Sequence, residues 1–315
     1  MKTLNNKSGI RHISLAALIC LAACTGSMPK QMYTDNPTSG EIAISVDESF
    51  KPFIESEVYV FQQLYPDAKI NVRYTSEQQA MNDMLFDTTR LAIIGRDLND
   101  FEKYVFDTMR ITPAKTKIAK DALCFIANHE NQDTSLYTAQ LKQIFRGEAT
   151  NWKQINKKST LGNIRVVFDQ NQSSNVQMLY RLFAKDNKFP DYCYAAKSNE
   201  EVIKFVKSNK NALGVIGAGW ISDVDDTTHL RFRSEIRVLS ISDDSLGFYK
   251  PYQGYIASTD YPLIREVYII SKEARSGLGT GLAAFIAGDK GQRIILKQGL
   301  VPATMPVRLI QTREE

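Results

Sequence analysis

The sequence predicts an α/β fold built on a doubly wound sheet, and two observations lead to that prediction. Short apolar runs typical of strands alternate with longer segments whose apolar residues recur at helical spacing. The composition, 43% hydrophobic and 23% charged over 315 residues, is that of a globular protein with enough chain for one large domain or two of normal size. The sequence contains no internal repeat and no low-complexity segment.

The first part of the chain alternates three strands with three helices. Strands are predicted at 42–46, 69–74 and 91–95, and helices at 50–65, 76–86 and 99–109. The first helix is indicated by Ile54, Val58 and Phe61, which share one helical face. The second opens on Ser76 with Gln79 three residues later, the spacing of a capping box. Strands and helices of these lengths favour parallel strands covered by helices on both faces.

The rest of the chain continues the alternation. Strands are predicted at 118–128, 164–168, 212–216, 236–241 and 267–270, and helices at 139–146, 173–185, 200–207, 279–287 and 290–298. Gly147 ends the first of these helices, as glycine commonly does. The pattern breaks at 245–254, which contains Gly247, Pro251 and Gly254.

The N-terminal segment has the layout of a secretory signal. A basic head with Lys2, Lys7 and Arg11 precedes an apolar run that is shorter than the roughly 20 residues needed to span a bilayer. The run ends Leu-Ala-Ala-Cys, which is similar to the bacterial lipobox, where cleavage leaves a lipidated cysteine. We therefore expect 1–23 to be a signal peptide and 24–39 a polar tether that is lipidated at Cys24. The alternative is an ordinary signal peptide that happens to contain a cysteine.

The charge balance argues against a nucleic-acid partner. Three of the 39 basic residues lie in the signal, which leaves 36 against 35 acidic residues. A nucleic-acid-binding protein would need a clustered basic face. The mature chain is therefore close to neutral, and its partners must be sought elsewhere.

Two cysteines remain once the signal is removed and Cys24 is modified. Cys124 lies in an apolar strand-like run, and Cys193 lies between two tyrosines. They could pair in an oxidising envelope. We expect two free thiols in the core, because a domain of this size does not need a disulfide.

Five stretches of the sequence, in order, resemble one family. They are 42–50 (IAISVDESF), 91–98 (LAIIGRDL), 141–147 (LKQIFRG) followed by Asn151 and Trp152, 212–217 (ALGVIG), and 288–293 (GDKGQR) followed by 299–302 (GLVP). The chain thereby resembles the periplasmic phosphate-binding proteins of ABC transporters, in particular shorter lipoprotein relatives of the Bacteroidetes type. One stretch alone is weak, but the ordered set is specific for the fold.

The resemblance implies a two-lobed periplasmic binding protein fold of type II. Each lobe would be a doubly wound sheet with flanking helices, and two crossovers would form the hinge. The domains expected from it are lobe 1 at 40–117 plus 252–315 and lobe 2 at 118–251. The ligand would lie in the cleft between the lobes.

Three helix starts match the family's ligand loops. They hold Ser49 and Phe50, then Thr75 and Ser76, then Ser173, Ser174 and Asn175, and each follows a predicted strand. Free N–H groups at helix starts bind anions, and open α/β sheets place ligands beyond strand ends. Each hydroxyl taken alone is equally explained as a helix cap.

Two charged positions depart from the family pattern. The resemblance places an acid where this chain has Arg90 and an arginine where it has Asp169. Either the two face each other across the cleft as a reversed pair, with Arg90 gripping an oxyanion, or the site has lost phosphate. Arg96 also matches a family position, as a second cleft contact or as a tie to Asp97 or Asp100.

Acidic residues crowd two of the helix starts. Asp47, Glu48 and Glu77 would satisfy the helix dipoles and repel a dianion by about 1–3 kcal/mol per pair. The alternative is that they point to solvent and leave the ligand unaffected.

No catalytic constellation is present in the sequence. His129 and His229 have no Cys or His partner at metal-ligand spacing, and no nucleophile turn or phosphate-cradling glycine loop occurs. We expect no enzyme activity, no cofactor and no metal.

The function implied by the resemblance is that of an envelope lipoprotein facing the periplasm. It would bind a small anion, phosphate first, as a monomer and deliver it to an ABC permease in the inner membrane. The alternative is a degenerate binding fold that acts as a sensor or interaction protein without phosphate.

Overall fold

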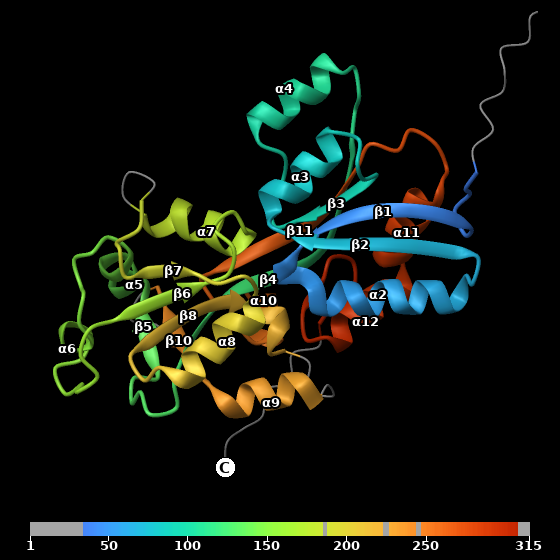
Figure 1. The fold of residues 1–315 in the computed structure, drawn as a ribbon. Coiled ribbons are helices and arrows are strands. Elements are labelled where there is room, and N and C mark those ends of the chain that lie inside the picture. Colours follow the sequence, from blue (N-terminus) through green and yellow to red (C-terminus); the bar gives the residue numbers. More distant parts are fainter. Residues whose placement is uncertain (1–33, 185–187, 223–226, 244–246, 308–315) are drawn as a thin grey trace, which may run out of the picture. The chain divides into compact units, whose positions relative to one another are not determined.

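Among the residues described, ten strands form one mixed sheet (Figure 1). The computed structural model describes residues 34–307 apart from 185–187, 223–226 and 244–246. The strands of the sheet are β1 (Gly40–Asp47), β2 (Ala68–Thr75), β3 (Leu91–Ile94), β4 (Ala114–Ala127), β6 (Arg165–Phe168), β7 (Cys193–Ala195), β8 (Ala212–Gly217), β9 (Arg237–Val238), β11 (Ile264–Ser271) and β12 (Val301–Pro302). The signal peptide and Cys24 lie outside the described residues.

The sheet is parallel at both sides and antiparallel at its centre. Its order is β2-β1-β3-β11-β4-β8-β6-β7, with β9 and β12 paired to β4 off this path. β1 runs parallel to β2 and β3, and β6 runs parallel to β7 and β8. β11 and β4 are antiparallel to each other and to their outer neighbours. Two parallel sets of strands therefore flank a central antiparallel pair.

The helices follow the strands closely. They are η1 (Glu48–Phe50), α2 (Lys51–Leu64), α3 (Glu77–Leu85), α4 (Asp100–Thr108), α5 (Thr138–Phe145), α6 (Trp152–Ile155), α7 (Ser174–Phe183), α8 (Asn199–Ser208), η2 (Ala218–Trp220), α9 (Thr227–Glu235), α10 (Gln253–Ala257), α11 (Leu278–Ala287) and α12 (Asp289–Lys297). Every helix predicted from the sequence is present. The α/β prediction is confirmed.

Short elements are where sequence and structure differ. The predicted strand at 236–241 is two strands, β9 and β10 (Ser240–Ser242). β9 pairs with β4, whereas β10 pairs with β5 (Ser135–Tyr137) in a separate two-stranded sheet. β5, β7, α6 and α10 have five residues or fewer, so they are too short to show a hydrophobic period.

Two large apolar clusters organise the two sides of the sheet. We call the first the lobe 1 core, which includes Ile44, Phe53, Phe61, Ile93, Val267 and Leu282. We call the second the lobe 2 core, which includes Phe125, Phe145, Trp152, Val167, Leu179 and Val215. These cores give the fold its two-lobed character.

The lobe 1 sheet is buried on both faces because β3 alternates between them. Leu91 and Ile93 belong to the lobe 1 core, whereas Ala92 and Ile94 pack in a smaller cluster with Met81 of α3 and Phe106 of α4. A parallel strand covered by helices on both sides needs apolar residues at every position, and all four residues of β3 are fully buried.

β4 is shared by the two cores. Residues 114–122 of this strand pair with β11, and 123–127 pair with β8. Between α10 and β11, Tyr261 packs in the lobe 2 core and donates a hydrogen bond to the Leu123 carbonyl over 2.6 Å. The predicted lobe boundaries stay a prediction.

The two described cysteines are free thiols, as expected. Cys124 is buried in β4 and Cys193 lies in β7 at the edge of the sheet. β8 and β6 separate these strands, so the thiols are more than 10 Å apart at about 4.8 Å per strand.

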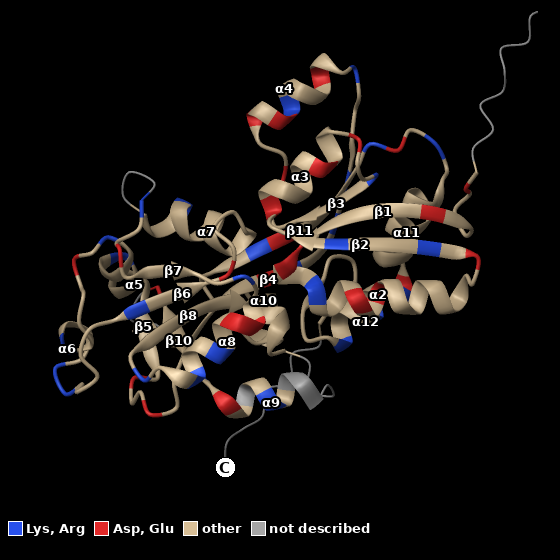
Figure 2. Cartoon of the chain, in the orientation of Figure 1, with Lys and Arg blue, Asp and Glu red and all other residues tan. Residues whose placement is uncertain are grey.

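The described part of the chain contains no candidate membrane span, and its charged residues of both signs are mixed along the elements. Its helices include none that is long and apolar enough to cross a bilayer. Figure 2 shows Lys and Arg interspersed with Asp and Glu over strands and helices of both sides.

Candidate functional site

The candidate site lies where the parallel strands of both lobes end. Asp47 at the end of β1 is in register with Thr75 at the end of β2, and β3 ends beside them. On the other side, β6 ends at Phe168 beside Val215 of β8. Each strand end leads into a helix start, so backbone N–H groups gather at this edge.

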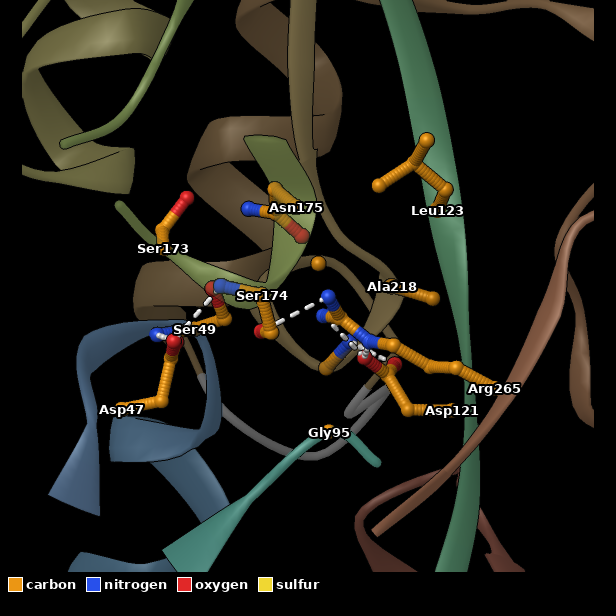
Figure 3. Close-up of polar contacts among 12 residues, drawn as sticks. Asp47, Ser49, Gly95, Asp121, Leu123, Ser173, Ser174, Asn175, Ala218 and Arg265 are labelled. Atoms are coloured by element: carbon orange, nitrogen blue, oxygen red, sulfur yellow. Dashed lines mark hydrogen bonds and ion pairs between the residues drawn. The ribbon is translucent and has the colours of Figure 1, made fainter. Parts of the chain in front are cut away.

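Six of the residues predicted for the ligand site come together here. One of the six is Asp169. Its carboxylate accepts hydrogen bonds from three others, Ser49, Ser173 and Asn175, over 3.1, 2.5 and 3.1 Å. The two others are Phe50 and Ser174. Figure 3 shows Ser49, Ser173, Ser174 and Asn175 gathered in one place from two separate parts of the chain.

Asp47 connects the two lobes through backbone N–H groups. Its Oδ1 accepts from the N–H of Ser49 over 2.8 Å, and its Oδ2 accepts from the N–H of Ser174 over 2.7 Å. Ser174 is the first residue of α7, and its N–H is one of the helix's free donors. One carboxylate therefore binds helix starts of both lobes (Figure 3).

Two more carboxylates hold donors at this edge. Glu48 accepts from the backbone N–H and the side-chain amide of Asn199, over 3.1 and 2.5 Å. Glu77 accepts from the Gly95 N–H over 2.9 Å. Asp47, Glu48 and Glu77 are 0%, 7% and 1% exposed. The alternative that these acids point to solvent is therefore wrong.

Arg265 of β11 supplies a buried positive charge at the site. Its guanidinium donates to Oδ2 of Asp121 over 2.9 and 2.6 Å and to the Ser174 hydroxyl over 2.9 Å. It also lies 4.8 Å from the centre of the Phe50 ring, within cation–π range. The side chains of Arg265 and Asp121 are 2% and 1% exposed, so this is a fully desolvated ion pair.

Sequence reasoning missed Arg265, although the sequence carries a signal for it. The burial of β11 alternates, and Arg265 shares the inward phase with Val267 and Ile269. A charged residue on the apolar phase of a strand needs a buried partner. Asp121, which directly precedes the apolar run 122–127 of β4, is that partner.

The alternative in which Arg90 faces Asp169 as a reversed pair is wrong. Arg90 donates to Asp35 and Glu273 over 2.5 and 3.0 Å. Arg90 precedes the first residue of β3, whereas the site lies beyond the last residue of this strand. At 3.3 Å per residue, Arg90 is roughly 16 Å from the end of the strand where the site lies. Asp169, by contrast, directly follows the last residue of β6, so Arg90 lies at the amino end of its strand and Asp169 at the carboxyl end of its own.

Arg96 is a structural tie rather than a direct member of the cluster. It binds Glu77 over 2.9 Å and Glu102 through a two-pronged contact of 2.8 Å each. It also donates to the backbone carbonyl of Asp97, one of its two expected partners. Arg96 therefore orients Glu77, which in turn holds Gly95.

Thr75 and Ser76 lie next to the cluster. Thr75 ends β2, and the Ser76 hydroxyl accepts from the Gln79 N–H over 3.3 Å as the cap of α3. The alternative that this hydroxyl caps its helix is thus correct for Ser76. The second residue of α3, Gln78, donates its N–H to the carbonyl of Gln172 across the site.

Burial, together with the charges of neighbouring carboxylates, raises several pKa values in the cluster. Burial raises the pKa of Glu48 to about 8, and the charges of Asp169 and Asp47 add to the rise. Burial also raises the pKa of Asp169, helped by the charge of Asp47 and opposed by the hydrogen bond from Ser173. The pKa of Glu77 is raised by burial against the pull of Arg96. Glu48 therefore keeps a proton that a free carboxyl group would lose at neutral pH.

One acceptor in the cluster lacks a donor among the described residues. Asn175 is 0% exposed, and nothing described there donates to its Oδ1. Its amide nitrogen is occupied by Asp169 and Asn199. A small oxyanion carrying a hydrogen would provide the missing donor. Within the described chain, no group of three or more His, Cys, Asp or Glu is arranged to hold a metal ion.

Gly95 allows the lobes to approach closely at the site. A Cβ at this position would lie 2.8 Å from the Ser174 Cβ and 3.2 Å from the Phe50 ring. Both distances are shorter than ordinary packing contacts, so any side chain at 95 would push α7 away from β3.

We expect Gly95→Ala to reduce the free energy of unfolding by about 1–3 kcal/mol through overpacking. Urea denaturation measures this change. Gly219→Ala is the matched control, because its Cβ would meet Leu300 at an ordinary 3.7 Å. Equal stability of the two variants would contradict the close approach at Gly95.

Comparison with known proteins identifies the class. The sequence profile of the PBP superfamily domain matches residues 32–290. The chain therefore belongs to the PBP superfamily.

The relatives agree with this assignment. The phosphate-binding protein PstS of Staphylococcus aureus (strain bovine RF122 / ET3-1) is 23% identical over 285 residues, 89% of this chain and 83% of the relative. The phosphate-binding protein PstS of Staphylococcus saprophyticus is 22% identical over 285 residues, 89% of this chain and 85% of the relative. The resemblance read from the sequence is confirmed. These relatives are binding proteins, which agrees with the expectation that the chain is not an enzyme.

Solved structures confirm the fold. One assigned to a phosphate ABC transporter substrate-binding protein with bound phosphate, from Clostridium perfringens, has a TM-score of 0.72 and 20% identity over 84% of this chain and 100% of that one. An ABC-type phosphate transport receptor from Vibrio cholerae has a TM-score of 0.62 and 20% identity, with coverage of 84% and 100%. The two-lobed α/β fold of type II is the architecture of this chain.

Proposed function

We propose that the chain binds phosphate between its two lobes and delivers it to an ABC importer. The observation that supports this most is the convergence of Ser49, Ser173 and Ser174 with Arg265 at the carboxyl ends of the strands. Hydroxyls, helix-start amides and one guanidinium are the groups that hold a tetrahedral oxyanion. The similarity to phosphate-binding relatives favours phosphate among such anions.

The setting proposed for this activity is the cell envelope. The basic and apolar N-terminal segment ending at Cys24 supports export and lipid anchoring, with the domain facing the periplasm. The partner would be a permease of the inner membrane, and the chain would act as a monomer. The lobes, proposed at 40–117 plus 252–315 and 118–251, would separate to admit the anion.

A specific observation favours a second candidate. Asp47, Glu48 and Glu77 already occupy amide donors that an anion would use. A domain whose anion sites are satisfied by its own side chains can serve as an envelope sensor or interaction protein without phosphate. The two candidates differ in whether phosphate stabilises the protein.

A thermal-shift screen of the soluble form beginning at Thr25 separates the candidates. Phosphate at 100 times its dissociation constant should add about 2.7 kcal/mol to the free energy of unfolding. We expect this shift with phosphate and a smaller one with sulfate. Arg90→Gln should keep the phosphate shift, because Arg90 lies at the opposite strand end, whereas Arg265→Met should remove it. No shift with any anion would favour the sensor.

A further inference from the structure

Asp47 occupies the position of a bridging ligand. Its two oxygens bind the Ser49 and Ser174 N–H groups, which belong to helix starts on the two lobes. The carboxylate is 0% exposed, and no cation contacts it in the hydrogen bonds and ion pairs of the described residues. The N–H groups of the two helix starts are therefore the donors that stabilise this carboxylate, and they would stabilise a bound anion in the same way.

Asp47 differs from an ordinary helix cap in its second contact. The bond to Ser49 spans two residues and is local. The bond to Ser174 spans 127 residues and joins β1 to α7. Ser173 already caps α7 through its own hydroxyl, so α7 does not need Asp47 as a cap. The contact therefore serves the joining of the lobes.

We propose that Asp47 is a built-in substitute for the anion, which holds the two lobes together when no ligand is bound and must be displaced by the ligand. This inference rests on the proposed function for the identity of the competitor, phosphate. A carboxylate and a phosphate group share the chemistry that helix starts recognise, namely oxygens carrying negative charge. Because Asp47 is tethered, it acts at a high effective concentration, on the order of millimolar or above.

Neighbouring contacts reinforce the same closure. Ser49 donates to Asp169, and Glu48 accepts from Asn199, so two further bonds cross between the lobes beside Asp47. These bonds do not occupy the Ser174 N–H. Removal of Asp47 should therefore free that donor for phosphate.

The test uses two variants and one matched control. Asp47→Ala removes both acceptors, and Asp47→Asn keeps the shape but can accept through only one oxygen. Asp83→Asn is the control, because Asp83 is also buried but binds Ser45 and Arg73, which both lie in lobe 1. Small-angle X-ray scattering in phosphate-free buffer measures the lobe separation, and titration calorimetry measures the phosphate dissociation constant.

We expect Asp47→Ala to have a larger radius of gyration than wild type without phosphate and to return to the wild-type value with it. Its phosphate dissociation constant should fall at least tenfold, with Asp47→Asn in between and Asp83→Asn unchanged. An unchanged radius, or an equal or weaker affinity, would overturn the inference. If no variant binds phosphate while Asp47→Ala still expands, the proposed function fails and the joining role stands. If wild type binds phosphate while Asp47→Ala neither expands nor binds more tightly, the proposed function stands and the joining role of Asp47 fails.

Discussion

Arg265→Met is expected to lower the free energy of unfolding by about 3–5 kcal/mol, the largest loss from any single change at the site. Methionine fills much of the same volume but leaves the Asp121 carboxylate buried without its partner. It also removes the donor to the Ser174 hydroxyl and the contact with the Phe50 ring. Urea or guanidinium denaturation monitored by circular dichroism measures the change.

A double variant separates the charge from the packing. Arg265→Met combined with Asp121→Leu removes both charges together, and replacing a whole buried pair with apolar groups is often close to neutral. We expect the double variant to recover most of the stability lost in Arg265→Met. Equal instability of the single and double variants would show that packing, rather than the unpaired carboxylate, accounts for the loss.

Glu48→Gln is expected to stabilise the protein at neutral pH by about 2–3 kcal/mol. The folded state raises the pKa of Glu48 from 4.5 to about 8, so at pH 7 folding must add a proton to this carboxyl. The contribution of a carboxyl with a raised pKa is complete below its unfolded value and is lost as pH rises through the folded one. Stability should therefore fall between pH 4.5 and pH 8 in wild type, and less steeply in Glu48→Gln.

Denaturation at pH 4.5, 6, 7 and 8 tests this expectation. The gain from Glu48→Gln should be near zero at pH 4.5 and greatest at pH 8. Glu57→Gln is the control, because Glu57 is a buried carboxyl of α2 whose pKa burial raises to about 9 and which has no partner among the described residues. The stability advantage of both variants over wild type should grow with rising pH, but only Glu48→Gln should alter phosphate binding. A gain that is independent of pH would contradict the raised pKa of Glu48.

The fold could be read from the sequence because its main elements repeat a strong local pattern. In β3, four apolar residues in succession indicate a strand covered on both faces, and the structure buries all four. The helix start at Ser76 carries a capping signal, and Ser76 caps α3. Local sequence fixes these features, so no tertiary information was needed.

The site could be read only in part, for a geometric reason. The sequence predicted the helix starts that carry Ser49, Ser76 and Ser173, because a strand end followed by a helix start is a local feature. Arg90 was misplaced because the family resemblance assigned it to the ligand site although it precedes the strand, whereas the site lies beyond the end of that strand. Arg265 was missed because its role depends on Asp121, 144 residues away, and on a sheet order that places β11 beside β4.

The role of Asp47 could not be read from sequence at all. Its distance of 127 residues from Ser174 leaves no local trace, and an acid before a helix is an ordinary dipole partner. The sequence did predict that acids at these helix starts would satisfy the helix dipoles and repel a dianion. It could not indicate that one of them bridges two helix starts.

The strand shared by the two hydrophobic centres has a consequence for anyone who wishes to study one half alone. β4 gives its first residues to a neighbour in one half and its last residues to a neighbour in the other. If the chain is cut before or after β4, one of the two halves loses this central strand. The neighbouring strand in that half is then left with an exposed hydrogen-bonding edge. Neither half is a separable module, even though each has its own apolar interior.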